Sequence, residues 1–161
     1  VGAAAVEVRD LLAEMGLESF VKTTGGKGLH VVMPLQPRYG WDEVKLFARS
    51  VAAELVRRAP AAYTATLSKK ARGGKIFIDY LRNQRGATAV APYSARARAG
   101  APVAVPLTWA EVEKGWRSDR FTIATLPDRL AKLRRDPWQG MLRMKQKLPA
   151  GVLRKLRAAG A

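Results

Sequence analysis

The sequence contains no cysteine, and His30 is its one histidine among 161 residues. Without thiolates there can be no disulfide and no zinc finger or ribbon, so a metal ion would need oxygen ligands or this single imidazole. No apolar run approaches the roughly 20 residues of a membrane-spanning helix, and no charged-then-apolar leader typical of a signal peptide is present. These absences predict a cytoplasmic protein with no membrane partner.

Acidic residues are scarce, with 13 Asp and Glu against 29 Lys and Arg, which gives a net charge of +16. This excess is larger than solubility requires and indicates a polyanionic partner. The basic residues are spread through predicted loops and strands and do not gather on one amphipathic helix, which favours nucleic acid over a membrane surface. A GC-rich genome also raises the arginine content, so charge alone does not decide.

The length and the nearly half apolar composition are sufficient for one domain with one core. Periodicity predicts an opening helix in which Val8, Leu11, Leu12 and Met15 share a face. Turn residues and alternation then predict strands at 18–22, 29–35, 63–67, 76–81 and 88–92, with 63–67 and 76–81 joined as a hairpin. Helices are predicted at 41–58, at 109–114 after an N-cap at Thr108, and twice beyond Pro127.

A glycine-rich turn, Thr24-Gly25-Gly26-Lys27-Gly28-Leu29-His30, lies between the first two predicted strands. Consecutive glycines leave backbone N–H groups free to point at an anion, which Lys27 would neutralise. The turn is not a Walker A loop, because Val21 and Gly28 stand where that loop needs Gly and Ser or Thr. A plain β-turn with positive-φ glycines is the alternative. The Thr24 hydroxyl and the His30 imidazole favour an anion site.

Asp79 is a candidate functional carboxylate in the predicted strand 76–81, where alternation places it on the same face as Phe77. A carboxylate there needs a cation, a metal ion or hydrogen-bond donors. Spacing slightly favours a salt bridge to Arg72, Arg82 or Arg85, or a turn cap, over a metal ion. No Asp-x-Asp pair exists in the chain, so Asp79 cannot by itself form a two-metal site.

Five loop arginines alternate with two tyrosines, Tyr80 and Tyr93, in the middle of the chain, and they are Arg72, Arg82, Arg85, Arg96 and Arg98. Such a mixture can bind phosphates by bidentate contacts and stack on bases or sugars. Each arginine taken singly could be a solvated surface residue. As a set they indicate a polyanion-binding face without distinguishing a triphosphate from a template strand.

Three ordered segments carry a resemblance: SFVKTTGGKGLHVVMPL, ARGGKIFIDYLRNQRGATAVAPYSARARAGAPVAVPLTW and DPWQGM. Together they resemble, nearly end to end, the polymerase/primase domain of bacterial multifunctional DNA ligase D, in the archaeo-eukaryotic primase superfamily. The resemblance implies an α/β (α+β) fold, a primase-like palm with a mixed or antiparallel sheet flanked by helices. Residues 1–148 would be the C-terminal portion of that domain, with its N-terminal part missing, and 149–161 a basic tail or linker.

The resemblance also implies a site in which three aspartates bind two divalent ions, Mn²⁺ or Mg²⁺. Asp79 matches the third of these aspartates and would be a catalytic metal ligand, while the first two are expected before the opening helix. The family turn has Ser where this chain has Thr24, which retains the hydroxyl. Residues implied in binding the nucleotide or its phosphates are Thr24, Gly25, Gly26, Lys27, His30, Arg72, Arg96 and Arg98.

The activity implied is template-dependent or terminal addition of nucleotides, from NTP or dNTP substrates, to DNA 3′ ends during bacterial non-homologous end joining. Implied partners are DNA ends with an RNA or DNA primer strand, Ku, and ligase and nuclease domains, in a nucleoid-associated system. Because two metal aspartates are missing, the fragment alone is expected to be inactive. The alternative is a non-catalytic nucleic-acid or nucleotide-binding module, and a remoter one is a phosphate-dependent enzyme using His30 as base.

Overall fold

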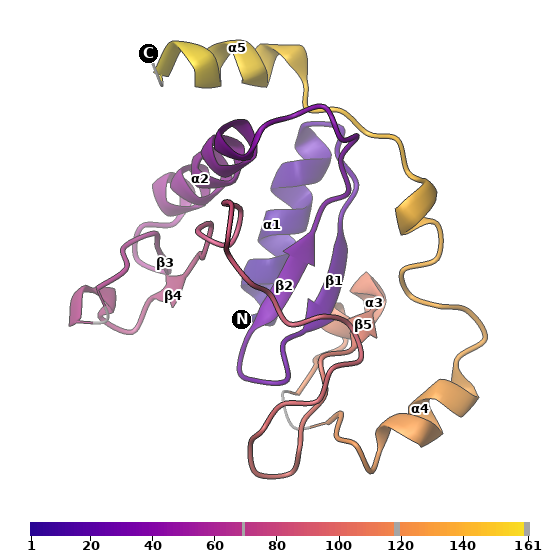
Figure 1. The fold of residues 1–161 in the computed structure, drawn as a ribbon. Coiled ribbons are helices and arrows are strands. Elements are labelled where there is room, and N and C mark those ends of the chain that lie inside the picture. Colours follow the sequence, from indigo (N-terminus) through magenta and orange to yellow (C-terminus); the bar gives the residue numbers. More distant parts are fainter. Residues whose placement is uncertain (69, 118–119, 160–161) are drawn as a thin grey trace.

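The computed structural model describes residues 1–68, 70–117 and 120–159. Helices and strands are mixed along the chain, as expected for the predicted α/β (α+β) class (Figure 1). The elements, in order, are α1 (Gly2–Glu14), β1 (Phe20–Thr23), β2 (Leu29–Val32), α2 (Trp41–Arg58), β3 (Tyr63–Thr64), η1 (Lys70–Arg72), β4 (Ile76–Phe77), β5 (Pro106–Leu107), α3 (Trp109–Glu113), α4 (Leu126–Lys132), η2 (Met141–Arg143) and α5 (Ala150–Ala159).

A three-stranded antiparallel sheet with the order β2-β1-β5 forms the centre of the fold. In its register Val21 lies opposite Val31, and Lys22 lies opposite His30. Because successive side chains of a strand point to opposite faces, these two pairs face opposite sides of the sheet. Figure 1 shows α1 behind the sheet and the segment after β4 crossing in front of it.

Two apolar clusters hold the helices to the sheet. The larger joins α1, α2 and the start of β3 through buried side chains such as Leu11, Phe47, Leu55 and Tyr63. The smaller is built around β1, β5 and α3, with Val21, Val105, Leu107, Val112 and Phe121 buried. The predicted apolar face of the opening helix is thus confirmed, since Val8, Leu11, Leu12 and Met15 all belong to the larger cluster.

Two predicted helices are confirmed, because residues a few positions apart in the sequence determine where each helix begins. Helix α2 has the predicted limits, and its first turn is closed by Glu43, which accepts a hydrogen bond from the Gly40 N–H at 3.1 Å. Thr108 caps α3, as predicted, in a reciprocal arrangement with Glu111: the hydroxyl accepts from the Glu111 N–H at 3.2 Å, and the carboxylate accepts from the Thr108 N–H at 2.8 Å.

The predicted hairpin of 63–67 and 76–81 is wrong. Strands β3 and β4 have two residues each and pair in parallel, with Tyr63 opposite Ile76. Between them the chain makes the turn η1 and then two left-handed residues, Gly73 and Gly74, with φ of +49° and +80°. This connection brings the chain back in its original direction, which a short hairpin loop cannot do.

Two further predicted elements are absent from the part of the chain that the structure describes. Residues 88–92 form no strand, and the pairing begins only after them, where the Tyr93 N–H donates to the Ala104 carbonyl at 2.6 Å. The second helix predicted beyond Pro127 is also absent. After Pro137 the chain forms only the 3-10 turn η2, because Gly140 takes a left-handed φ of +90°. It instead wraps along the sheet, where the Trp138 indole donates to the Val21 carbonyl at 2.9 Å.

The C-terminal residues form α5, which lies against α2 (Figure 1) and places Val152 and Leu153 on the larger cluster. Whether 149–161 serves as a linker stays a prediction. In the described part of the chain, no helix combines the length and apolar character needed to cross a bilayer.

Candidate functional site

The glycine-rich turn connects β1 to β2 and is closed from within. The Thr24 N–H and hydroxyl both donate to the Gly28 carbonyl, at 3.2 and 3.0 Å. The hydroxyl predicted to face an anion is therefore engaged in holding the turn together in this structure. Lys27 lies exposed at its tip, where its ammonium is accessible to a ligand.

Two arginines from a distant loop pack onto this turn and leave too little room for a Cβ at two of its glycines. Gly25 has a φ of +62°, and a Cβ added to it would lie 2.6 Å from Cγ of Arg96. A Cβ on Gly26 would lie 3.1 Å from Nη1 of Arg98. Arg96 also donates through Nη1 to the Thr24 carbonyl at 3.3 Å. Glycine is thus required for close approach as well as for backbone conformation, and the turn and its two predicted arginines form one unit.

The loop 94–102 presents these arginines because its backbone folds back on itself. The Arg96 N–H donates to the Pro102 carbonyl at 2.8 Å, and Ala95 forms an isolated antiparallel bridge with Val103. Tyr93, just before the loop, and Ala101, near its end, take positive φ values of 62° and 41°. Non-glycine residues rarely adopt such φ angles, and they do so most often where the surrounding structure fixes a functional geometry.

His30 belongs to the face of the sheet that looks toward this loop. Burial, and then the nearby charges of Lys22, Arg82 and Arg96, lower its pKa to about 4, while Asp79 opposes the shift. At neutral pH the imidazole is therefore uncharged and can donate one hydrogen bond without carrying a positive charge. His30 therefore lies within electrostatic range of Asp79 and of Arg96, the arginine that packs on the turn.

Lys22 is a member of this face that the sequence motifs did not single out. Its side chain is buried, with 3% of the residue exposed, and Nζ has no hydrogen-bond partner. Burial, and then repulsion by Arg96, lower its pKa to about 8. The available signal was strand alternation: in a strand with Val21 on the packed face, Lys22 must face the same side as His30, its cross-strand neighbour.

Asp79 lies past the end of β4 and not within a strand, so the prediction that strand alternation places it on the same face as Phe77 is wrong. The last ladder bond runs from the Ile78 N–H to the Thr64 carbonyl at 2.9 Å. The Asp79 carboxylate then accepts from the Leu81 N–H at 3.0 Å and lies 3.7 Å from Nε of Arg82. Both alternatives, the turn cap and the arginine partner, are found, and the side chain is 38% exposed.

Arg72 is not brought to the turn by any of its described contacts. It lies in η1, where its guanidinium stacks on the Phe77 ring at 4.3 Å from the centroid and donates to the Leu67 carbonyl at 3.1 Å. Among the residues expected to bind phosphate, it is the one whose described contacts give no proximity to the others. Its predicted role in nucleotide binding therefore has no geometric support here.

The described residues do not form a metal site. Within residues 1–68, 70–117 and 120–159, no three His, Asp or Glu side chains gather closely enough to hold an ion. Asp79 is a single carboxylate already near a guanidinium, and hard divalent ions need several oxygen ligands. The predicted divalent ion therefore remains an expectation of the family resemblance, for which these residues supply one ligand at most.

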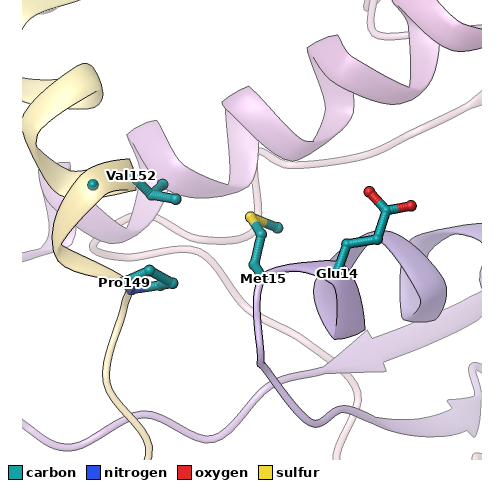
Figure 2. A pocket seen from close by; sticks show the side chains of 5 residues that line it. Glu14, Met15, Pro149 and Val152 are labelled. Atoms are coloured by element: carbon teal, nitrogen blue, oxygen red, sulfur yellow. The ribbon is translucent and has the colours of Figure 1, made fainter.

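Two hollows on the surface lie elsewhere. One, between α1 and α5, is lined by Glu14, Met15, Pro149, Gly151 and Val152 (Figure 2). Its carboxylate is paired with Arg58 at 2.7 Å, so it offers little beyond apolar surface. The other lies beside α4, around Phe121, with Arg120 and Arg129 stacked on that ring. Neither hollow is lined by residues of the turn.

Comparison with known proteins shows the family and the fold of the chain. The family model described as the LigD primase-polymerase domain matches residues 1–138. The chain is 45% identical over 147 residues to the multifunctional non-homologous end joining protein LigD of Pseudomonas aeruginosa, covering 91% of this chain and 18% of that protein. It is 35% identical over 130 residues to the bifunctional non-homologous end joining protein LigD of Bacillus subtilis, covering 80% and 21%.

A solved structure, the polymerase domain from Mycobacterium tuberculosis ligase D in complex with DNA, superposes with a TM-score of 0.81 at 35% identity. The match covers 90% of this chain and 50% of that one. The chain thus spans about a fifth of the two relatives above and half of the solved domain. From the family model that matches residues 1–138, its sequence identity to the relatives and its shared fold, the chain belongs to the LigD primase-polymerase domain family.

Proposed function

We propose that this chain supplies the triphosphate-binding part of a nucleotidyltransferase that adds ribo- or deoxyribonucleotides to DNA 3′ ends in non-homologous end joining. The packing of Arg96 and Arg98 against Gly25 and Gly26 carries the proposal. Two guanidiniums held beside consecutive glycines bring together the positive charge and the backbone N–H groups that bind a polyphosphate. The names of the relatives, which refer to end joining, support the biological setting.

Four side chains that lie at or near the turn have distinct parts in this proposal. Arg96 and Arg98 bind phosphate oxygens, Lys27 reaches the outer phosphates from the exposed tip, and the uncharged His30 donates one hydrogen bond. In the reaction a primer 3′ hydroxyl attacks the α-phosphate and diphosphate leaves. Cations held at the turn would stabilise the charge that develops on that leaving group. Arg72 is the weakest of the candidates, given its place on Phe77.

The catalytic and metal-binding role of Asp79 remains a proposal. Its carboxylate would have to exchange Arg82 for an ion, and further carboxylates would be required because no described cluster completes a metal site. We therefore expect the 161-residue chain alone to bind nucleotides without polymerising them. Nucleotide addition by this chain at the level of a full polymerase domain would contradict that expectation.

DNA is the proposed macromolecular partner. The net charge of +16 supports it, and the solved relative is a complex with DNA. Ku and the ligase and nuclease domains are proposed as partners because the relatives are called multifunctional or bifunctional end-joining proteins.

A non-catalytic nucleotide-binding module is the second candidate, favoured by the absence of a metal cluster among the described residues. The two candidates differ in the role of Asp79. In a longer protein that contains this chain, Asp79→Ala should abolish nucleotide addition if the site is catalytic. Wild-type levels of addition by that variant would exclude the proposed catalytic role.

Nucleotide binding is tested by calorimetric titration of the 161-residue chain with ATP, with and without Mn²⁺. Lys27→Ala removes an exposed ammonium from the turn and should weaken binding by about tenfold. Lys114→Ala is the matched control, because Lys114 is also exposed but lies at the end of α3. Equal losses in both variants would mean that only the overall charge attracts ATP and would reject the turn as the site.

A further inference from the structure

Lys22 presents a physical problem that the proposed function does not by itself solve. It is almost fully buried in β1, and no acceptor lies within hydrogen-bond distance of its Nζ. A buried charge without a partner is unfavourable by several kcal/mol, whereas an apolar side chain of similar length would fit a strand interior without that penalty. An ammonium at this position therefore calls for an anion that the chain itself does not provide.

The groups around Lys22 identify where that anion would bind. His30 faces it from β2, Arg96 faces it from the loop 94–102, and its neighbour across the other edge of β1 is the uncharged Pro106. None of these groups is acidic. Lys22 is also two residues before Thr24, whose carbonyl binds Arg96. An anion bound to Arg96 at the turn is therefore also attracted by the charge of the Lys22 ammonium.

The surroundings of Arg96 indicate how Lys22 would act. Among the described residues, the side-chain hydrogen bond of Arg96 is the one to the Thr24 carbonyl, at 3.3 Å. Lys22 repels the same guanidinium from the buried side. A guanidinium held by a single long hydrogen bond and repelled from the protein interior remains available to an external acceptor.

We propose that Lys22 is a positioning residue of the phosphate site, whose buried ammonium keeps Arg96 directed outward and adds attraction for a polyphosphate at the turn. Because Nζ is buried away from solvent, it acts on the ligand through Arg96 and through its charge. The inference rests on the proposed triphosphate site. It adds to that site a residue that contributes binding energy at the expense of stability.

The direction of the pH dependence follows from the lowered pKa of Lys22, about 8. A bound polyanion favours the ammonium and raises that pKa, so binding takes up a proton when the amine is neutral beforehand. Affinity is then greatest below about pH 8 and declines as the pH rises above it. In the unliganded protein the sign is opposite, because the folded state disfavours the ammonium and gains stability as the pH rises from about 8.

The experiment compares the 161-residue chain with Lys22→Met, which keeps the length of the side chain and removes its charge. Lys114→Met, at the exposed end of α3, lowers the net charge equally and is the control. Calorimetric titration with inorganic tripolyphosphate at about pH 7 and about pH 9.5, on either side of the lysine pKa, gives the affinities, and thermal melting without ligand gives the stabilities. Using an inorganic ligand removes any contribution from base or sugar.

We expect Lys22→Met to bind tripolyphosphate about tenfold more weakly than the parent at about pH 7. The difference should shrink toward about twofold at about pH 9.5, where the parent lysine is itself largely neutral. Lys114→Met should stay within about twofold of the parent at both pH values. At neutral pH the unliganded Lys22→Met variant should melt at the same temperature as the parent or higher. In a chain that already carries Arg96→Met, adding Lys22→Met should weaken tripolyphosphate binding much less than it does in the parent.

Three outcomes would overturn the inference and are distinct from one another. Parent-like affinity of Lys22→Met at neutral pH would contradict it while leaving the proposed triphosphate site intact. A melting temperature well below that of the parent, with an unchanged pH profile, would show that Lys22 has a purely structural role. Failure of the parent chain to bind tripolyphosphate at either pH would contradict the proposed site together with the inference.

Discussion

Arg96 crosses from its loop to the carbonyl of Thr24, 72 residues earlier in the chain, and donates a hydrogen bond of 3.3 Å to it. Its aliphatic stem lies against Gly25, where a Cβ would come within 2.6 Å of Cγ. Gly25 and Arg96 are therefore complementary in shape. The Arg96 guanidinium can lie at the turn only because Gly25 has no Cβ.

Gly25→Ala should destabilise the chain and weaken phosphate binding. The substitution introduces a Cβ at a φ of +62° and against Arg96, and we expect a loss of about 2 to 3 kcal/mol in the free energy of unfolding. Gly16→Ala is the control, because Gly16 has a φ of +71° with no atom near its Cβ position. Urea unfolding of both variants separates strain from contact. Equal losses would show that the contact with Arg96 contributes nothing.

Trp138 fixes the C-terminal segment to the central strand. Its indole N–H donates to the Val21 carbonyl at 2.9 Å, and its ring meets Phe20 edge to face with centroids 6.4 Å apart. Trp138→Phe retains most of the ring and removes the donor, so we expect a loss of about 1 kcal/mol in chemical unfolding. Trp41→Phe, at a position that is 58% exposed, should change stability by a few tenths of a kcal/mol. A smaller loss at Trp138 than at Trp41 would contradict the anchoring role.

Arg129 and Glu111 link α4 to α3. The guanidinium makes two contacts with the carboxylate and donates to the Pro106 carbonyl at 2.9 Å, and the Arg129 side chain is 10% exposed. We expect Arg129→Met to lower the free energy of unfolding by about 2 kcal/mol, since it leaves Glu111 without its partner. Glu111→Gln, which keeps the shape and removes the charge, should lose less. The reverse order would show that shape outweighs charge in this contact.

The pH dependence of this link follows from the pKa of Glu111. Burial raises it, but hydrogen bonds from Arg129 and Thr108 outweigh burial, and the net shift is downward. The unfolded state therefore binds the proton more readily, so the link contributes fully above the ordinary glutamate pKa of 4.5 and is lost as the pH falls below it. Unfolding of the parent and of Arg129→Met should converge between about pH 6 and about pH 3. Parallel curves would contradict this linkage.

His30 should make the chain less stable in mild acid. Its pKa is about 4 in the folded state, against 6.5 for an unperturbed histidine, so the unfolded state binds more protons between these values. Stability is then fully present above about pH 6.5 and declines toward pH 4, by about 1 to 2 kcal/mol, because solvent screens a half-buried imidazole. His30→Gln should remove this part of the decline in urea unfolding. If the variant declines as steeply as the parent, the imidazole is not held neutral by the fold.

Much of the local structure could be predicted from the sequence, because it depends on neighbours in the chain. Helix α2 and the Thr108 cap follow from periodicity and from the spacing of Thr108 and Glu111. The turn between β1 and β2 follows from its glycines, and the family from three ordered motifs. The prediction that the strand continues through Asp79 is wrong, because alternation in IFIDYL cannot show where the pairing of β4 with β3 ends.

By itself the sequence determined the chemical character of this protein: a strongly basic, cysteine-free α/β chain of the LigD primase-polymerase family, with a glycine-rich turn that predicts an anion site. Only the tertiary structure decided which cations share that turn. Arg96 and Arg98 reach it while Arg72 stacks on Phe77, and Lys22 is buried close to Arg96. The reason is physical: alternation and spacing specify which face a side chain occupies, whereas the partner it meets depends on loop paths and burial, which arise when distant segments pack.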